Sequence, residues 1–351
     1  MRLDRLIDER ASILATIAEE AAPFAEFSRQ LLRGGKRFRA LFCWEGWRSV
    51  LPVPEQAPAA AVEGVVAAAG ALELFHAAAL VHDDLIDRSD TRRGAPSAHR
   101  RFERLHRDHG YAGDPETFGQ GGAVLLGDML QSWSDDLLLE ALRSVSAATA
   151  AGARREFERM RLDVTAGQYL DLVEERAWRV VPEEDALLRA ERVILYKSAK
   201  YSVEAPLVIG ARLAGASDEQ VQGLRDFGVP LGIAFQLRDD LLGVFGDPSV
   251  TGKPAGDDLV EGKRTVLVAV TRSLVPASSR RLLDELLGDP HLEPAQIALL
   301  QRTIRDSGAV DRVERMIEQN ADRARAALAA APLAQREGLA ALVAPLTQRS
   351  S

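Results

Sequence analysis

The chain is poor in several features that would place it in particular protein classes. Its 351 residues include a single cysteine, Cys43, so no intrachain disulfide can form, which fits a reducing compartment. Lys and Arg number 44 against 52 Asp and Glu, and this acidic balance disfavours a nucleic-acid-binding protein. Aromatic residues make up only 5% of the chain.

Uninterrupted apolar stretches are also scarce. Charged residues recur every few positions through the first 20 residues, so we expect no signal peptide. The apolar, Ala-rich stretch at 59–74 contains Glu63 and Glu73, which favours a buried core helix over a transmembrane segment. We therefore expect a cytoplasmic protein.

Strict apolar–polar alternation is rare, whereas Ala, Leu, Glu and Arg abound, so the sequence predicts an all-α fold. Residues 88–117, rich in Arg, Gly and His, are predicted to form a loop across one mouth of a helical bundle. We expect one domain spanning residues 1–351. The predicted helices lie near residues 4–20, 22–33, 36–50, 58–89, 120–148, 151–175, 183–198, 200–213, 217–245, 262–273, 276–287, 294–305, 308–330 and 332–346.

A first acidic cluster lies in "LVHDDLIDRSDTRRG", residues 80–94. In a helix, Asp83 and Asp87 share one face and Asp84 lies on the adjoining face. Such like charges repel each other, and aligned carboxylates suit Mg²⁺, which prefers hard oxygen ligands. A solvated acidic helix end is the alternative, but the apolar neighbours indicate partial burial. Arg92 and Arg93 follow at once.

A second acidic pair, Asp239 and Asp240, lies in an apolar helical pattern far downstream. A Gly-rich loop with Lys253 and Lys263 follows it. Two acidic clusters that are each followed by cations predict metal ions bridging a polyphosphate.

A basic segment, "RGGKRFRA" at residues 33–40, precedes both clusters. We expect its two glycines to turn the backbone and Lys36, Arg37 and Arg39 to lie in the first turn of a helix. The helix macrodipole disfavours cations there, so an anionic ligand would explain them. A solvated basic cap is the alternative.

Other polar helix residues are ordinary taken singly, and a solvated helix face is the simpler interpretation for them. These residues are Gln168, Asp171, Lys197, Ser198 and Lys200. Asp135 and Asp136 have no basic stretch behind them and are predicted to lie on a helix surface.

With these motifs in this order, the chain resembles the trans-isoprenyl diphosphate synthases (polyprenyl synthetase family), and most of all the bacterial geranylgeranyl diphosphate synthases. The resemblance runs from Gly34 to Thr265 by motif and further by helical pattern. It implies an isoprenoid synthase fold, a bundle of long helices around a deep central cavity, usually in a homodimer. It also implies condensation of isopentenyl diphosphate with a dimethylallyl, geranyl or farnesyl diphosphate.

The resemblance assigns roles by position. It implies that Asp83, Asp84, Asp87, Asp239 and Asp240 hold about three Mg²⁺ ions on the allylic diphosphate. Residues that match those binding or ionising this substrate are Arg92, Lys197, Gln236, Lys253 and Lys263. Residues that match the isopentenyl diphosphate site are Lys36, Arg39, His76 and Arg93. Ser198 stands where threonine is usual.

The second acidic motif departs from the family pattern, because Gly243 stands where a third aspartate is common. We expect activity to survive, since that aspartate is usually the least direct contributor. Asp247 lies two helical turns beyond Asp239, about 12 Å along an ideal helix, and cannot simply replace it.

The residues before Asp83 bear on product length. Ala78 and Ala79 lie five and four positions before it, where bulky aromatics in this family stop growth at short chains. Phe75 lies eight positions before it and is predicted to form the cavity floor, which points to geranylgeranyl diphosphate. The alternative is that Phe75 faces a neighbouring helix and the product is longer.

Two other functions remain open from the sequence. A class I terpene cyclase shares the first acidic motif but needs no isopentenyl site, so Lys36, Arg39 and His76 count against it. A non-catalytic partner subunit of another synthase should have lost site residues, and only Gly243 hints at such a loss.

Overall fold

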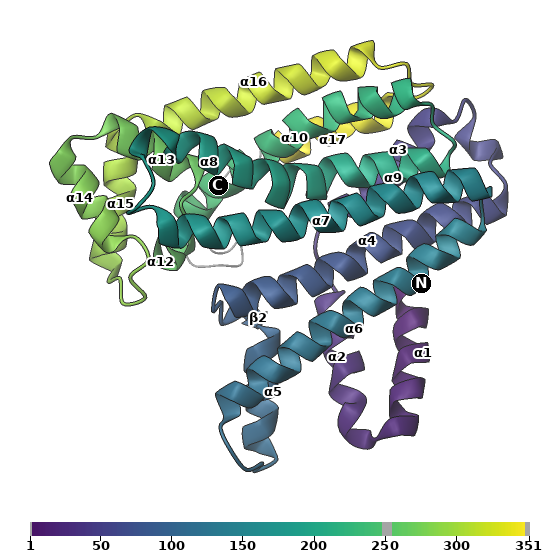
Figure 1. Ribbon diagram of the computed structural model, residues 1–351, viewed down its shortest axis with the longest axis horizontal. Helices are drawn as coiled ribbons and strands as arrows, with labels where there is room; N and C mark the ends of the chain where they lie inside the picture. The colour runs from purple at the N-terminus through teal and green to yellow at the C-terminus, as the bar shows by residue number, and fades with distance from the viewer. Residues whose placement is uncertain (1, 248–254, 348–351) are drawn as a thin grey trace.

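A computed structural model describes residues 2–247 and 255–347. Over these ranges the protein is almost entirely helical, and its strands are limited to one two-stranded hairpin, which confirms the all-α prediction (Figure 1). The α-helices and strands are α1 (Arg2–Ile17), α2 (Ala22–Leu31), α3 (Phe38–Val50), α4 (Ala59–Ile86), β1 (Thr91–Arg92), β2 (Ala95–Pro96), α5 (Ala98–Asp108), α6 (Pro115–Arg143), α7 (Ala147–Ala177), α8 (Ala186–Val193), α9 (Ala205–Leu213), α10 (Asp218–Phe245), α12 (Asp257–Glu261), α13 (Val266–Leu274), α14 (Ala277–Leu286), α15 (Pro294–Asp306), α16 (Ala309–Ala330) and α17 (Glu337–Thr347). Three short 3₁₀ segments, η1 (Glu19–Ala21), η2 (Pro54–Gln56) and η3 (Glu183–Asp185), and a π-helical segment, η4 (Ile194–Glu204), complete the list.

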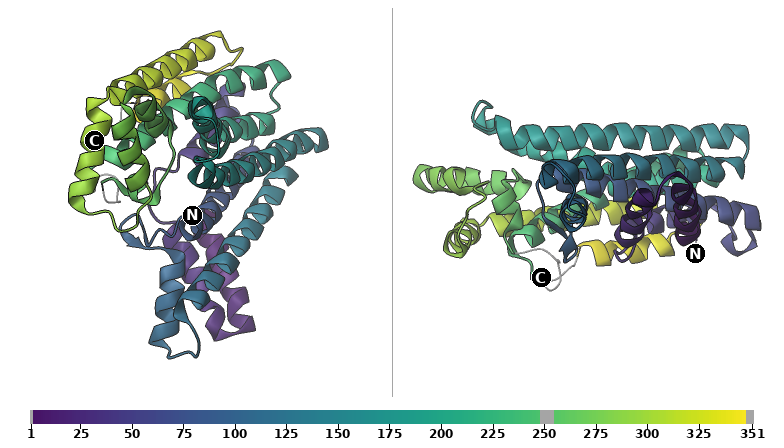
Figure 2. Two further views of the ribbon diagram at one scale, coloured as in Figure 1. Left: turned by 60° about the vertical axis from the view of Figure 1, so that its left-hand side comes forward. Right: turned by 90° about the horizontal axis from the view of Figure 1, so that it is seen from below.

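The long helices form a layered bundle. α4 packs along α6, α7 packs on η4, and α10 packs between η4 and α16 (Figure 1). The short helices α14 and α15 stay together at one end of the bundle in both views of Figure 2. The C-termini of α4 and α10 point toward this side of the bundle, where α12 also lies (Figure 1).

α4 is the central helix of the amino-terminal half. It is the one described helix that is long and apolar enough to cross a membrane, but 67% of its most apolar window is buried inside the protein. A helix that is apolar on all sides fits a position surrounded by other helices. Such a helix is weak evidence for a membrane segment, and its burial agrees with the predicted core helix.

The prediction of a loop over residues 88–117 is wrong for residues 98–108, which form α5. α5 packs on α6 so closely that a Cβ at Gly122 would be 2.5 Å from the Phe102 ring. The ring also meets Phe27 edge-on at a centroid distance of 4.9 Å. The sequence shows no apolar helical periodicity here because the buried face of α5 carries polar residues, including His99 and Glu103.

Several other helix boundaries differ from the prediction, and α6, α13 and α17 begin four or five residues away from the predicted starts. α3 begins at Phe38, and Arg37 caps it with a positive φ of 49°, so Lys36 and Arg37 precede the first helical turn instead of lying in it. The helices predicted at 183–198 and 200–213 are joined: α8, η4 and α9 run without a break.

The π-helical segment η4 is held by two close approaches of backbone. A Cβ at Gly167 of α7 would be 2.4 Å from the amide nitrogen of Lys197, and a Cβ at Gly232 of α10 would be 2.6 Å from Cα of Ala199. Glycine is therefore required at both positions for η4 to lie this near its neighbours. π-helical segments often occur at functional sites, and η4 carries Lys197 and Ser198.

Candidate active site

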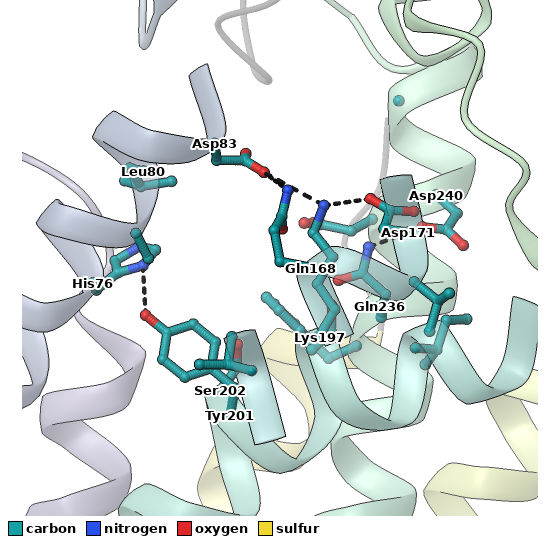
Figure 3. Close-up of a pocket in the computed structure, with 18 of the residues that line it drawn as sticks. His76, Leu80, Asp83, Gln168, Asp171, Lys197, Tyr201, Ser202, Gln236 and Asp240 are labelled. Atoms are coloured by element: carbon teal, nitrogen blue, oxygen red, sulfur yellow. Dashed lines mark hydrogen bonds and ion pairs between the residues drawn. The ribbon is translucent and has the colours of Figure 1, made fainter. Parts of the chain in front are cut away.

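A cavity of about 780 Å³ opens at the end of the bundle where α4 and α10 terminate. α3, α4, α7, η4, α10 and α12 all contribute side chains to its wall. Figure 3 shows Asp83 on one side of this cavity and Asp171, Gln236 and Asp240 on the other. Residues more than 150 positions apart in the sequence thus share one site.

Asp83 is the centre of the first acidic cluster. Its Oδ1 accepts a hydrogen bond from Gln168 Nε2 at 3.0 Å and lies 3.4 Å from Lys197 Nζ (Figure 3). Its Oδ2 accepts a bond from Arg92 Nη2 at 3.3 Å. Burial opposes ionisation, but the cations of Lys197, Lys263 and Arg92 outweigh it and hold the pKa of Asp83 well below its usual range. Asp83 is therefore an anion at neutral pH.

The other two acids of the first cluster differ from each other. Asp84 is almost fully buried, and its Oδ1 accepts a hydrogen bond from Arg92 Nε at 2.8 Å. Asp87 ends α4, and its Oδ2 lies 3.4 Å from Lys263 Nζ. Burial and the nearby Asp83 charge raise the pKa of Asp87 to about 6. Asp83 and Asp87 thus have the ammonium groups of Lys197 and Lys263 beside them, and Arg92 reaches both Asp83 and Asp84.

The second acidic pair lies on α10 across the cavity. Asp239 and Asp240 both line the wall, and Gln236 donates from Nε2 to Asp240 Oδ1 at 2.8 Å. Burial raises the pKa of Asp240 to about 8, with smaller contributions from the charges of Asp258 and Asp239. A cation at this place would favour the ionised carboxylate.

Lys263 lies between Asp87 of the first cluster and two acidic residues of α12. Its ammonium lies 3.4 Å from Asp87 and 3.8 Å from Asp258, and it also pairs with Glu261. Burial alone would lower its pKa, but these carboxylates raise it well above the usual value, so Lys263 stays charged. Lys253, predicted to act beside it, lies outside the described residues.

A basic pocket continues the cavity away from the acidic clusters. Arg39 donates to Ser202 Oγ at 2.7 Å and lies over the Tyr201 ring, 4.3 Å from its centroid. His76 Nδ1 is 3.2 Å from the Tyr201 hydroxyl. Burial, and then the charges of Arg39 and Arg93, hold the pKa of His76 well below its usual value, so the imidazole is neutral. Lys36 lines the same wall.

The adjacent arginines Arg92 and Arg93 diverge. Arg92 reaches Asp83 and Asp84, whereas the Arg93 guanidinium lies against Gly35, where a Cβ would be 2.8 Å from its Nη2. Arg93 has a positive φ of 54°, a conformation that costs energy for a non-glycine residue and often marks functional sites. One arginine thus serves the acidic clusters and the other the basic pocket.

The arrangement fits divalent metal ions. Oδ2 of Asp240 is buried and accepts no hydrogen bond from the described residues, whereas the buried Oδ2 of Asp87 has the Lys263 ammonium 3.4 Å away. Within the described residues no three His, Cys, Asp or Glu side chains converge on one point. Mg²⁺ typically takes one or two carboxylates and completes its shell with water and substrate phosphates, so separated carboxylates around a polyphosphate suit it.

The polyprenyl synthetase family model matches residues 22–304. The chain belongs to the polyprenyl synthetase family. A geranylgeranyl diphosphate synthase of Sulfolobus acidocaldarius is 32% identical over 73% of this chain and 68% of its own length. A geranylfarnesyl diphosphate synthase of Aeropyrum pernix is 31% identical over 87% of this chain and 86% of its own.

A solved family structure agrees with the whole fold. It is a geranylgeranyl pyrophosphate synthase from Corynebacterium glutamicum, complexed with isoprenyl diphosphate and magnesium, and it superposes with a TM-score of 0.92 at 38% identity. The match covers 99% of this chain and 97% of that chain. The isoprenoid synthase fold and the trans-prenyltransferase activity expected from the sequence are thereby confirmed.

Several cavity residues were missed or underrated in the sequence. Gln168 and Asp171 of α7 looked like ordinary helix residues, yet Gln168 bonds Asp83 and Asp171 accepts from Lys197 (Figure 3). Tyr201 and Ser202 complete the basic pocket. Their positions relative to Lys197 on one helix were the only available signal, because only tertiary packing brings α7 and η4 against α4.

Other predicted positions lie elsewhere. Lys200 pairs with Asp163 at 3.0 Å and does not appear on the cavity wall. Asp135 and Asp136 lie on the surface of α6, paired with Arg161 and Arg10, as predicted. Ser198 and Gln236 line the cavity.

The residues predicted to control chain length lie at different depths. Ala79 lines the cavity, with Leu80 and Val164 nearby on its wall. Ala78 has no exposed surface and lies in the core. Phe75 is not among the described residues that line the cavity. Its ring packs edge-on against the rings of Phe157 and Tyr201, at centroid distances of 6.2 Å and 5.9 Å. Its role as the floor therefore stays a prediction, and any floor there is shared with Phe157.

Proposed function

We propose that the acidic clusters of α4 and α10 bind the diphosphate of an allylic substrate through Mg²⁺, and that the basic pocket binds isopentenyl diphosphate. The supporting observation is that carboxylates from two helices face each other across one cavity, with buried charged lysines between them. When bound, Mg²⁺ would neutralise the diphosphate and stabilise its departure. Asp83, Asp84, Asp87 and Asp239 are the residues that would hold about three such ions.

Lys197, Lys263 and Arg92 assist the same departure. They keep their charge in a buried site, where an electrostatic interaction is stronger than in water. Arg92 suits this task because its planar guanidinium grips phosphate oxygens in pairs. Asp171 orients Lys197 by accepting its hydrogen bond, and Gln168 and Gln236 orient the carboxylates of Asp83 and Asp240. Charge on the departing diphosphate is thus balanced without a protein nucleophile.

On the other side of the cavity, Lys36, Arg39 and Arg93 surround the position for isopentenyl diphosphate, and the neutral His76 offers a hydrogen bond without adding charge. The pocket would place the isopentenyl double bond beside the allylic carbon as its diphosphate leaves. The new carbon–carbon bond forms, and the departing pyrophosphate takes the released proton. A class I terpene cyclase would have no use for this basic pocket.

We propose geranylgeranyl diphosphate as the main product. Ala79 leaves the upper wall open beside α4, and the Phe75–Phe157 pair lies about one helical turn deeper. A geranylgeranyl product requires an open upper turn and a barrier below it.

We further infer a homodimer built from one domain per chain, in the cytoplasm. Exposed apolar side chains lie along the outer face of α6, among them Val124, Leu125 and Leu139. A second copy covering them would remove apolar area from water. Light scattering of the purified protein measures its mass in solution and so tests the dimer directly.

The decisive experiment is incubation with MgCl₂, isopentenyl diphosphate and each of the three allylic primers. The expected result is a linear prenyl diphosphate, identified by chromatography after dephosphorylation, and no product with EDTA. A cyclic hydrocarbon formed without isopentenyl diphosphate would indicate a cyclase. Absence of any product until a second synthase is added would indicate a partner subunit.

A further inference from the structure

Gly243 has no room for a side chain. It lies one helical turn after Asp239 on α10, on the same face. A Cβ at Gly243 would overlap Oδ2 of Asp258 and lie 3.0 Å from its Oδ1. The space where a third aspartate of the second motif would begin is therefore filled by the carboxylate of Asp258.

Backbone hydrogen bonds hold Asp258 in this position. The Gly256 amide donates to the Gly243 carbonyl at 3.1 Å, which ties the start of α12 to α10. The carbonyl of Asp258 accepts from the amides of Gly262 at 3.1 Å and Lys263 at 3.0 Å. Gly256 and Gly262 flank α12 with positive φ values of 84° and 81°, which favour glycine. The carboxylate is thus presented by a short, well-anchored turn.

We propose that Asp258 supplies the third carboxylate of the second acidic motif from α12, and that Gly243 is glycine because it makes room for it. This inference rests on the proposed binding of a magnesium diphosphate by the two motifs. Asp258 lines the same cavity as Asp239 and Asp240. Its Oδ1 is also 3.8 Å from Lys263, whose ammonium reaches Asp87 of the first motif.

A simpler role for Asp258 is to neutralise Lys263. The two roles predict opposite effects of removing the charge. A counter-ion lost from Lys263 would free a cation facing the diphosphate and tighten anion binding, with or without Mg²⁺. A lost contributor to the metal site would weaken binding, and only when Mg²⁺ is present.

The test is calorimetric titration of the full-length protein with inorganic pyrophosphate, with and without MgCl₂. Asp258→Asn should weaken magnesium-dependent binding by about 10- to 100-fold, the usual cost of removing a group that supports a metal site. Asp226→Asn removes the same charge from an exposed position of α10 that is not on the cavity wall, and it should bind as the wild type does. Unchanged or tighter binding by Asp258→Asn would overturn the proposal.

A carboxylate exchange guards against a merely misfolded variant. Asp258→Gly should bind magnesium pyrophosphate weakly, and the double variant Gly243→Asp, Asp258→Gly should recover most of the loss, because the acid returns on α10. Melting temperatures of all variants identify any that fail to fold. Failure of the exchange to rescue a folded protein would also reject the proposal. Asp239→Asn tests the proposed function separately. If this variant still binds magnesium pyrophosphate as the wild type does, the proposed magnesium site of the two motifs is wrong. If Asp239→Asn loses binding and Asp258→Asn does not, only the role of Asp258 is rejected.

Discussion

Ala79 offers the most direct test of the proposed product. Its side chain lines the cavity, four residues after Phe75 on α4. Four residues rise about 6 Å along a helix, close to the length of one isoprene unit. Moving the aromatic barrier from position 75 to position 79 should therefore shorten the product by about one unit. Ala79→Phe should make mainly fifteen-carbon or shorter products where the wild type makes twenty.

The assay is chromatography of dephosphorylated products under excess isopentenyl diphosphate. A graded series, Ala79→Val, Ala79→Leu and Ala79→Phe, should shift the product progressively as the side chain grows. Phe75→Leu should shift it toward longer chains, since it opens the contact with Phe157.

A stability control separates a blocked cavity from a loosened fold. Ala78 has no exposed surface, so Ala78→Phe must displace core neighbours and should cost about 1–3 kcal/mol of unfolding free energy. Ala79→Phe projects into the cavity and should change the melting temperature less. A wild-type product of thirty carbons or more, or an unshifted product in an active Ala79→Phe variant, would refute this placement of the floor.

Three further outcomes are expected. Asp83→Ala and Asp239→Ala should each lower kcat by on the order of 10³ or more, as expected when a metal site is broken, and near-normal turnover at saturating Mg²⁺ would contradict their roles. Arg93→Ala should mainly raise KM for isopentenyl diphosphate and Arg92→Ala that for the allylic primer, each by roughly 30- to 150-fold for a lost charged contact of ~2–3 kcal/mol; equal effects on both substrates would argue against the division. The pKa values of Asp87 and Asp240 are raised from 3.8 to about 6 and about 8. Between pH 3.8 and about 8 the metal-free folded protein therefore binds more protons than the unfolded chain. The contribution of these two groups to the stability of the folded protein should be greatest below pH 3.8 and should fall as pH rises toward 8, while stabilisation by Mg²⁺ should increase over the same range. Thermal melts with and without MgCl₂ measure both effects. A metal effect independent of pH would count against these carboxylates as ligands.

The sequence alone determined the helical class and the family, and it singled out most of the charged residues that line the cavity. Apolar periodicity is a local property, and the motifs around Asp83 and Asp239 carry their chemistry within a few helical turns. It could not reveal α5, because that helix turns polar residues such as Glu103 toward its neighbours.

Tertiary structure decided which side chains meet. Gln168 and Asp171 became part of the site only because Gly167 lets α7 approach η4 closely enough to bring them beside Lys197 and Asp83. The sequence marks Gly243 as the loss of a carboxylate, whereas the fold fills the same space with Asp258 from another segment. Contacts between residues far apart in the chain depend on how helices pack, and a local pattern carries no record of that packing.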